Sequence, residues 1–407
     1  MNIYQSLQQT SDRVKAKELE SEQFYTELWP KIVTLTKDQI KEVLLFSEDL
    51  SVESEKSMAV HNFAVGMCSV FLGDFVKAID YCQNAYKTFL ELEYDPGTMA
   101  ACCITAIAHR SMGQLDKAQQ WLQLSNDYLG KLSVDNPYYY FQAITSYQAA
   151  ELCREFKKYE DALKHYERGI NFTFDNVELK GRLESGMGVT YMDLENVEMA
   201  KTYFQKALDS IKDSENFLLE SKIYSDLSIY YRKIKDLDLA LHNQLNSLRI
   251  REEHNLTSPI ITSYVLLAQI YFDKGEPDNC IEFATKAIEK STQLNTIIKL
   301  FDAHEIISRA YEAKGETEKA FDHYKKYHHF KDVVHNDEVA RRIEQINLGH
   351  QLDTKEKEKE IFRLRNVELR LALDEIHDSF TYASRIQRSL LTSEKYIRTA
   401  LDRLNKN

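Results

Sequence analysis

The chain has 407 residues, of which 43% are hydrophobic and 29% charged, and its formal net charge is −12. A net charge of this sign makes nucleic acid a poor partner, because a surface that binds a polyanion would act against the field of the whole protein. Only 12 glycines and 5 prolines occur. This composition predicts long helices with few tight turns.

Two absences narrow the class of protein further. The N-terminal stretch MNIYQSLQQTSDRVKAKELESEQ has no apolar core of the signal-peptide type, and no run of about 18 apolar residues occurs in the chain. We therefore expect a cytoplasmic protein with no membrane partner. The six cysteines show no CxxC spacing, which favours small buried side chains in a reducing compartment.

Residues 1–58 form the first predicted element. In the stretch FYTELWPKIVTLTKDQIKEVLLFSEDL, apolar side chains recur at helical spacing. We expect N-terminal capping helices here, because the open end of a repeat array would leave an apolar face in water.

Residues 59–335 carry a pattern that returns about every 40 residues. YFDKGEPDNCIEFATKAI at 271–288 comes back as YEAKGETEKAFDHYKKY at 311–327, and small residues recur in three columns. The columns are Gly66, Ala106, Ala150, Gly188, Ser228, Ala268 and Ser308; then Ala78, Ala118, Ala162, Ala200, Ala240, Cys280 and Ala320; and then Ala85, Ser125, Gly169, Ala207, Ser247 and Ala287. Small side chains at fixed offsets let antiparallel helices approach closely and let each pair dock on the next. The pattern predicts an all-α fold of about seven helix pairs.

An aromatic column accompanies the small residues, at Tyr191, Tyr231, Tyr271 and Tyr311. Together these columns resemble the tetratricopeptide repeat, although the period is longer than the usual value of about 34 residues. The resemblance implies a superhelical solenoid that binds a peptide or protein on its concave surface, which is lined mainly by the first helix of each pair.

On the register of that family, two positions of each repeat face the concave surface: six residues before the first small column and four residues after it. Five of these positions are cationic, namely Arg110, Arg154, Arg182, Lys222 and Arg232. Guanidinium groups pair well with carboxylates and phosphates. We therefore expect a track for an acidic peptide or protein. The alternative is that these cations solvate an exposed face or pair with carboxylates such as Glu151 and Glu184.

Residues 336–392 read as one long helix with a coiled-coil seam. Alternating steps of four and three residues connect Phe362, Asn366, Leu369, Leu373, Ile376, Phe380, Ala383, Gln387 and Leu390. This heptad pattern predicts a homodimer through the C-terminal helix; the alternative is a helix that packs back on the repeats. The stretch DTKEKEKE at 353–360 is expected to be a solvated connection, and residues 393–407 a tail or the start of a missing output domain.

Two further resemblances fall in this C-terminal helix. KEKEKEIFRLRNVELRLALDEI followed by DSFTYASRIQRSLL is similar to the linker that joins tetratricopeptide repeats to a sporulation-type serine/threonine phosphatase in bacterial signalling proteins. The matching residues are Asp378, Ser379, Tyr382, Ala383, Arg385, Ile386 and Gln387. EIHDS at 375–379 resembles the phosphoacceptor box of some histidine kinases, where His377 would take the phosphoryl group. These resemblances imply either a stand-alone relative or the sensory region of such an enzyme.

The sequence shows no catalytic motif. GxxxxGK[ST], HExxH, GxSxG and EF-hand patterns are all missing. No metal is expected at His323, His328, His329 and His335, because adjacent helical residues diverge by about 100°. We therefore predict a non-enzymatic signalling or regulatory protein without a cofactor, which binds a protein or acidic peptide and relays that event to its C-terminal coiled coil.

Overall fold

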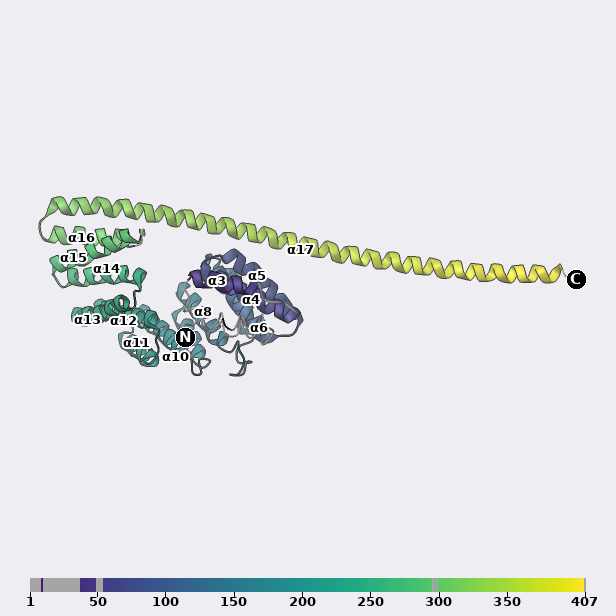
Figure 1. Cartoon of the computed structure of the whole chain (residues 1–407), viewed down its shortest axis with the longest axis horizontal. Helices are drawn as coiled ribbons and strands as arrows, with labels where there is room; N and C mark the ends of the chain where they lie inside the picture. The colour runs from purple at the N-terminus through teal and green to yellow at the C-terminus, as the bar shows by residue number, and fades with distance from the viewer. Residues whose placement is uncertain (1–8, 10–36, 49–53, 295–296, 298, 406–407) are drawn as a thin grey trace. The chain divides into compact units, whose positions relative to one another are not determined.

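The computed structural model describes residue 9 and residues 37–48, 54–294, 297 and 299–405. All regular secondary structure in these ranges is helical, which confirms the predicted fold class (Figure 1). The chain divides into two compact units, Met1–Gln345 and Ile346–Asn407, and the long helix α17 (Thr317–Leu404) contributes to both.

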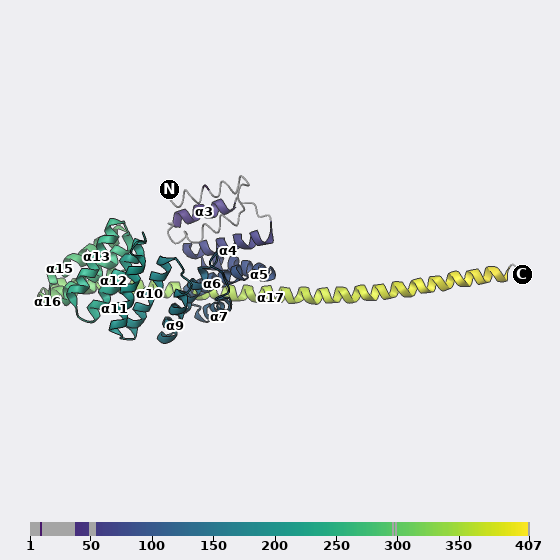
Figure 2. The ribbon, with the colours of Figure 1, turned by 90° about the horizontal axis from the view of Figure 1, so that it is seen from below.

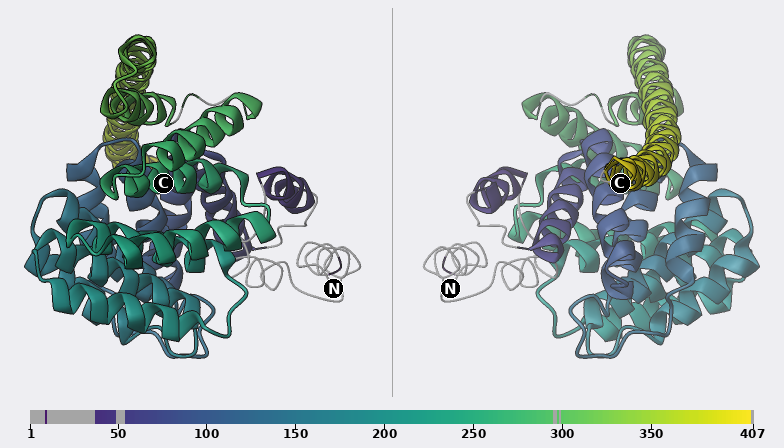
Figure 3. Two further views of the ribbon diagram at one scale, coloured as in Figure 1. Left: turned by 90° about the vertical axis from the view of Figure 1, so that its left-hand side faces the viewer. Right: turned by 90° about the vertical axis from the view of Figure 1, so that its right-hand side faces the viewer.

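The first unit contains seven successive helix pairs in its described residues. The pairs are α4 (Glu55–Leu72) with α5 (Phe75–Glu91), α6 (Asp95–Ser111) with α7 (Leu115–Asn126), α8 (Phe141–Glu155) with α9 (Tyr159–Ile170), α10 (Val177–Asp193) with α11 (Val197–Ile211), α12 (Phe217–Lys233) with α13 (Leu237–Glu253), α14 (Thr257–Asp273) with α15 (Pro277–Gln293), and α16 (Leu300–Ala313) with the first turns of α17. Figures 2 and 3 show each pair beside the next in a curved stack.

The predicted capping helices lie mostly outside the described residues. Within 1–58, the structure describes Gln9, α3 (Lys37–Glu48) and the start of α4. Ile40 and Val43 of α3 belong to the same buried cluster as Val60 and Phe63 of α4. Helix α3 therefore covers apolar side chains of the first repeat.

The three columns of small residues are buried, and they lie where helices meet. A Cβ atom built on Gly66 would overlap the Cys82 sulfur, and one on Gly188 would lie 2.7 Å from the Phe204 ring. A serine in a column can bond to another helix through its hydroxyl: Ser228 donates to the Ala240 carbonyl at 2.8 Å. The columns are thus close contacts between helices, as the sequence predicted.

The turn inside each pair has a common backbone form. The residue seven places after the first small column has a positive φ in all seven pairs: Gly73, Gly113, Lys157, Glu195, Lys235, Gly275 and Gly315. This left-handed residue ends the first helix, and glycine adopts it most easily. The next residue is the N-cap of the second helix. Asp74, Asn196 and Asp236 at this position accept a hydrogen bond from the N–H three residues further on.

The second unit is the remainder of α17. The helix continues without a break through residues 353–360, where Thr354, Lys357 and Glu358 are exposed, and on to Leu404. No helix end marks the positions 335/336 or 392/393, so the domain boundaries 59–335, 336–392 and 393–407 stay predictions. Apolar side chains are exposed along this stretch, including Leu369, Leu373, Ile376 and Phe380.

Candidate functional site: a cationic groove in the repeat array

Three of the five predicted cations form ion pairs between successive repeats. Arg110, Arg154 and Arg232 lie in the last turns of α6, α8 and α12. Each contacts a carboxylate in the first helix of the following repeat: Arg110 with Glu155 at 3.5 Å, Arg154 with Asp193 at 3.1 Å, and Arg232 with Asp273 at 2.6 Å. The acidic partner always lies five residues after the first small column. These three charges therefore join neighbouring repeats.

The other two predicted cations, Arg182 of α10 and Lys222 of α12, are exposed and lie further from the helix ends. Lys222 pairs with Asp226 one turn along its own helix at 2.6 Å. Arg182 has no ion pair with any residue that the structure describes. Of the five side chains, Arg182 therefore keeps the greatest freedom to bind a ligand.

A groove of about 550 Å³ brings Arg154, Arg182 and Lys222 together. Its walls come from α8, α10 and α12, the first helices of three successive pairs, with contributions from α13 and α14. Arg110 and Arg232 do not line it. The structure thus places three of the five predicted residues at one cavity and the other two outside it.

Arg251 also lines this groove, and sequence reasoning missed it because it belongs to α13, a second helix. Its side chain is almost fully buried, and it donates to the Pro259 carbonyl at 3.0 Å and to the Ser263 hydroxyl at 2.7 Å. Burial lowers the pKa of Arg251 to about 10, while the negative charge of Asp226 acts in the opposite direction. A buried guanidinium with neutral partners leaves a positive potential at the groove.

Arg154 is held in place by neighbours on both sides. Glu151 accepts a hydrogen bond from the Tyr166 hydroxyl and lies 3.5 Å from the Arg154 guanidinium. Burial raises the pKa of Tyr166 above its usual range, and the adjacent Glu151 charge raises it further. Tyr166 therefore stays a neutral donor at neutral pH. Glu151 was expected as a partner of the groove cations; Glu184, the other expected carboxylate, accepts instead from Ser210 at 2.7 Å.

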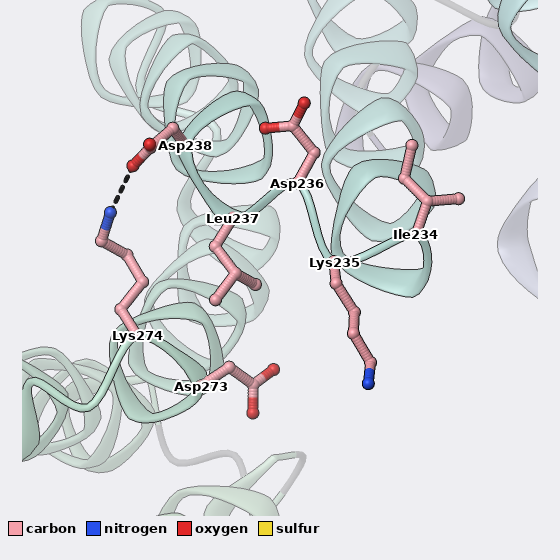
Figure 4. A pocket seen from close by; sticks show the side chains of 7 residues that line it. All are labelled: Ile234, Lys235, Asp236, Leu237, Asp238, Asp273 and Lys274. Atoms are coloured by element: carbon pink, nitrogen blue, oxygen red, sulfur yellow. Dashed lines mark hydrogen bonds and ion pairs between the residues drawn. The ribbon is translucent and has the colours of Figure 1, made fainter.

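A second cavity, of about 700 Å³, lies at the turn between α12 and α13 and beside the end of α14 (Figure 4). Its three carboxylates already have partners within the protein. Asp273 pairs with Arg232, Asp238 with Lys274, and Asp236 accepts from the backbone of Leu239. Because all three carboxylates already have partners, this cavity offers less to a ligand than the cationic groove.

The histidine and cysteine side chains are the remaining candidates for metal binding in the described residues. No three His, Cys, Asp or Glu side chains there are grouped to hold a metal ion. His323 lies against His304, with 3.0 Å between their Nδ1 atoms, whereas His328, His329 and His335 are exposed. Burial raises the pKa of the Cys68, Cys103 and Cys280 thiols to about 12, which opposes formation of a reactive thiolate. None of the described helices has the length and apolar content of a membrane span.

Comparisons with known proteins show which proteins share this architecture. The family model of the tetratricopeptide repeat matches residues 186–213 and 261–289. A signal transduction ATPase with numerous domains and a tetratricopeptide repeat sensor, from Pyrococcus horikoshii, is similar in structure, with a TM-score of 0.59 and 14% identity over 83% of this chain and 55% of that chain. The apo form of RapI is similar with a TM-score of 0.52 and 13% identity, over 68% of this chain and 99% of that one. A search of curated proteins found no match.

The matched repeats, the seven helix pairs and the solved neighbours agree on the fold. The chain carries tetratricopeptide repeats at residues 186–213 and 261–289, and its helix pairs have the fold of the tetratricopeptide-repeat solenoid. This fold is typically non-catalytic and is used to bind protein partners.

Proposed function

We propose that this chain is a non-enzymatic regulatory protein that binds an acidic peptide or protein segment in the cationic groove. The observation that supports this most directly is the charge at the groove. Arg154, Arg182, Lys222 and Arg251 line it with Glu151 and Asp226, which leaves an excess of two positive charges in a chain whose net charge is −12. A local potential opposite to that of the whole protein favours a ligand with carboxylates or phosphates.

A peptide-display selection from a library of random sequences tests the proposal. Peptides enriched by the intact chain should be rich in Asp and Glu. The double variant Arg182→Glu/Lys222→Glu should bind them at least about tenfold more weakly, since each partly desolvated charge pair contributes on the order of 1–3 kcal/mol. Raising the salt concentration should weaken binding to the unaltered chain.

The matched control reverses two exposed cations on second helices, Arg168→Glu in α9 and Lys201→Glu in α11, which do not line the groove. It has the same net charge as the groove variant and should keep the affinity. Circular dichroism of both variants checks that the helices are retained. Enrichment of neutral or basic peptides, or equal loss in both variants, would contradict the groove as the binding site.

The second part of the proposal is that the C-terminal helix pairs with a second copy and relays ligand binding. The seam begins at Phe362, and after Leu390 the same steps of four and three reach Glu394, which is charged, and then the apolar Ile397, Leu401 and Leu404. Most of its apolar residues are exposed, and the helix continues to the end of the seam. A polar residue at a seam position, here Asn366, is a common way to fix register in a parallel pair.

Light scattering at tens of micromolar tests the pairing. The intact chain should be a dimer, and the variant Leu369→Glu/Ile376→Glu should be a monomer, because both changes place charge in the seam. Leu371→Glu is the matched control: it also replaces an exposed leucine of the same helix, but off the seam. A monomeric intact chain would exclude this part of the proposal.

An alternative function is that of the sensory region of a tetratricopeptide-linked serine/threonine phosphatase or histidine kinase. The stretch DSFTYASRIQ lies on α17, in one continuous helix with the last repeat. Such a helix would carry a change in the array toward a domain joined after it. The reading frame of the gene is the deciding observation: a domain with metal-binding aspartates beyond Asn407 would favour the phosphatase, and a nucleotide-binding domain the kinase.

A further inference from the structure

Two of the four cations at the groove have no acidic partner among the described residues. Arg154 lies beside Glu151 and Asp193, and Lys222 pairs with Asp226. Neither Arg182 nor Arg251 forms an ion pair with a residue that the structure describes. The excess positive charge of the groove is therefore carried by one exposed and one buried guanidinium.

A buried hydroxyl accompanies these two guanidinium groups. Ser185 of α10 lines the same groove, is 2% exposed, and its Oγ atom has no hydrogen-bond partner in the described part of the chain. The Nε atom of Arg154, also at this groove, is likewise buried without a partner there. Buried polar groups in folded proteins are nearly always hydrogen-bonded, so unpartnered donors at one cavity indicate a missing acceptor.

We propose that Arg182, Ser185 and Arg251 form a subsite that binds one anionic group, a carboxylate or a phosphate, of the ligand. This inference rests on the proposed function, since it assigns the part of the groove that would hold an acidic group of the bound segment. An anion there would accept from the Ser185 hydroxyl and from the guanidinium groups, and charge-assisted bonds of this kind are roughly twice as strong as those between neutral groups. Glu151 and Asp226 are each paired with another cation. The charge of Asp226 acts on Arg251 without an ion pair between them among the described residues.

Arg251 has an evident structural role as well. It connects α12, α13 and α14 through its bonds to Ser221, Pro259 and Ser263. A substitution there can weaken the fold and ligand binding together. Ser185 and Arg182 provide the cleaner test, because no side-chain hydrogen bond or ion pair among the described residues depends on either of them.

The first experiment titrates the intact chain with inorganic phosphate at constant ionic strength, followed by calorimetry. We expect one saturable site. Ser185→Ala and Arg182→Gln should each weaken phosphate binding by about threefold to tenfold, with the unfolding midpoint in the absence of phosphate unchanged. Arg251→Lys should weaken it as well, because a point charge does not replace the planar fork.

Arg249→Gln is the matched control. Arg249 is a cation of the same helix, two residues from Arg251, but it is exposed, pairs with Glu253 and does not line the groove. This variant should bind phosphate as the intact chain does. Unsaturable binding, or affinity that is the same in the Ser185→Ala and Arg182→Gln variants as in the intact chain, would overturn the inference.

Three small probes distinguish the sources of the anion: N-acetyl-glutamate amide for a side-chain carboxylate, N-acetyl-alanine for a chain terminus, and N-acetyl-phosphoserine amide for a phosphate. The probe that binds most tightly and responds to Ser185→Ala identifies the group. The test of the subsite can fail or succeed independently of the test of the proposed function. Selected acidic peptides that bind without any response to Ser185→Ala would leave the groove function standing and remove the subsite; phosphate binding without selection of acidic peptides would do the reverse.

Discussion

The repeat array and the C-terminal part of α17 both carry apolar side chains at helical spacing, but they differ in where those side chains find partners. In the array, Phe204 is fully buried between helices of the same chain, and the small columns around it allow close approach. On α17, Phe380 occupies a seam position and is 76% exposed. A repeat of about 40 residues places each helix beside other helices of the same chain. A seven-residue repeat gives a single helix an apolar face but does not by itself place another helix of the chain against it.

The largest difference between the two regions should appear on truncating a phenylalanine. Phe204→Ala should lower the free energy of unfolding of the array by about 3–5 kcal/mol, because it removes a buried ring and leaves a cavity. Phe380→Ala should leave that value within about 0.5 kcal/mol and weaken self-association instead. Urea unfolding followed by circular dichroism, together with light scattering, measures both quantities. Comparable unfolding midpoints for the two variants would contradict the comparison.

The second prediction compares alanine-to-leucine substitutions in the repeat array and in the C-terminal part of α17. Ala240 is fully buried and lies in the second small column, so Ala240→Leu should overpack the contact between helices and destabilise by about 1–3 kcal/mol. Ala383 is exposed and lies in the seam of α17. Ala383→Leu adds apolar surface there, and we expect unchanged stability of the array with tighter self-association. An unaltered melting profile of the Ala240→Leu variant would count against the register of the small columns.

The small columns were predictable because close helix packing requires small side chains, and a fixed repeat length places them at fixed offsets. The turns were only partly predictable. Four of the seven left-handed turn positions hold glycine, which the sequence signals, but Lys157, Glu195 and Lys235 occupy the other three. At those pairs the surrounding helices impose a backbone conformation that the residue itself does not favour.

The candidate site was also only partly predictable from the sequence. The first-helix register led to Arg154, Arg182 and Lys222 at the groove, since it depends on periodicity alone. It did not separate these from Arg110 and Arg232, which lie outside the groove. A signal for the ion pairs was present: Glu155, Asp193 and Asp273 all follow the first small column by five residues. Arg251 gave a weaker signal, as a cation four residues after the buried Ser247, and only the tertiary structure shows that it reaches the groove.

A pH change should loosen the last repeat before the others. His304 of α16 lies against His323 of α17, and its ring also stacks on Phe330. Burial lowers the pKa of His304 to about 4, and the positive charges of His323 and Lys326 contribute to the decrease. The pKa of His323 is also lowered, mainly by burial and then by Lys326, against the opposing effect of Asp322.

The sign follows from proton binding. Unfolded histidine takes up a proton near pH 6.5, but folded His304 resists protonation until about pH 4. The stabilisation is therefore complete above about pH 6.5 and is lost as the pH falls toward 4; between pH 7.5 and pH 5 the loss should be about 2 kcal/mol. Hydrogen exchange at α16, compared at pH 7.5 and pH 5, measures it. His304→Gln should remove most of this pH dependence and leave the part that comes from His323, and His328→Gln, at an exposed position, should keep all of it.

The smallest effect concerns the ion pairs between repeats. Arg232 and Asp273 join α12 to α14, and Arg232 also donates to Gln269 at 2.6 Å, so both ends are held by the packing of the repeats. Arg249 and Glu253 form a comparable pair at 2.9 Å within α13, where both side chains are more exposed. A double-mutant cycle with Arg232→Gln and Asp273→Asn should give a coupling energy near about 1 kcal/mol, and the cycle for Arg249 and Glu253 about 0.3–0.5 kcal/mol. Partial burial and a preset geometry reduce both the solvent screening and the side-chain entropy lost by the pair between repeats. If the two cycles give the same coupling, the recurring offset of cation and acid along the array contributes no more to its stability than any exposed pair on a single helix.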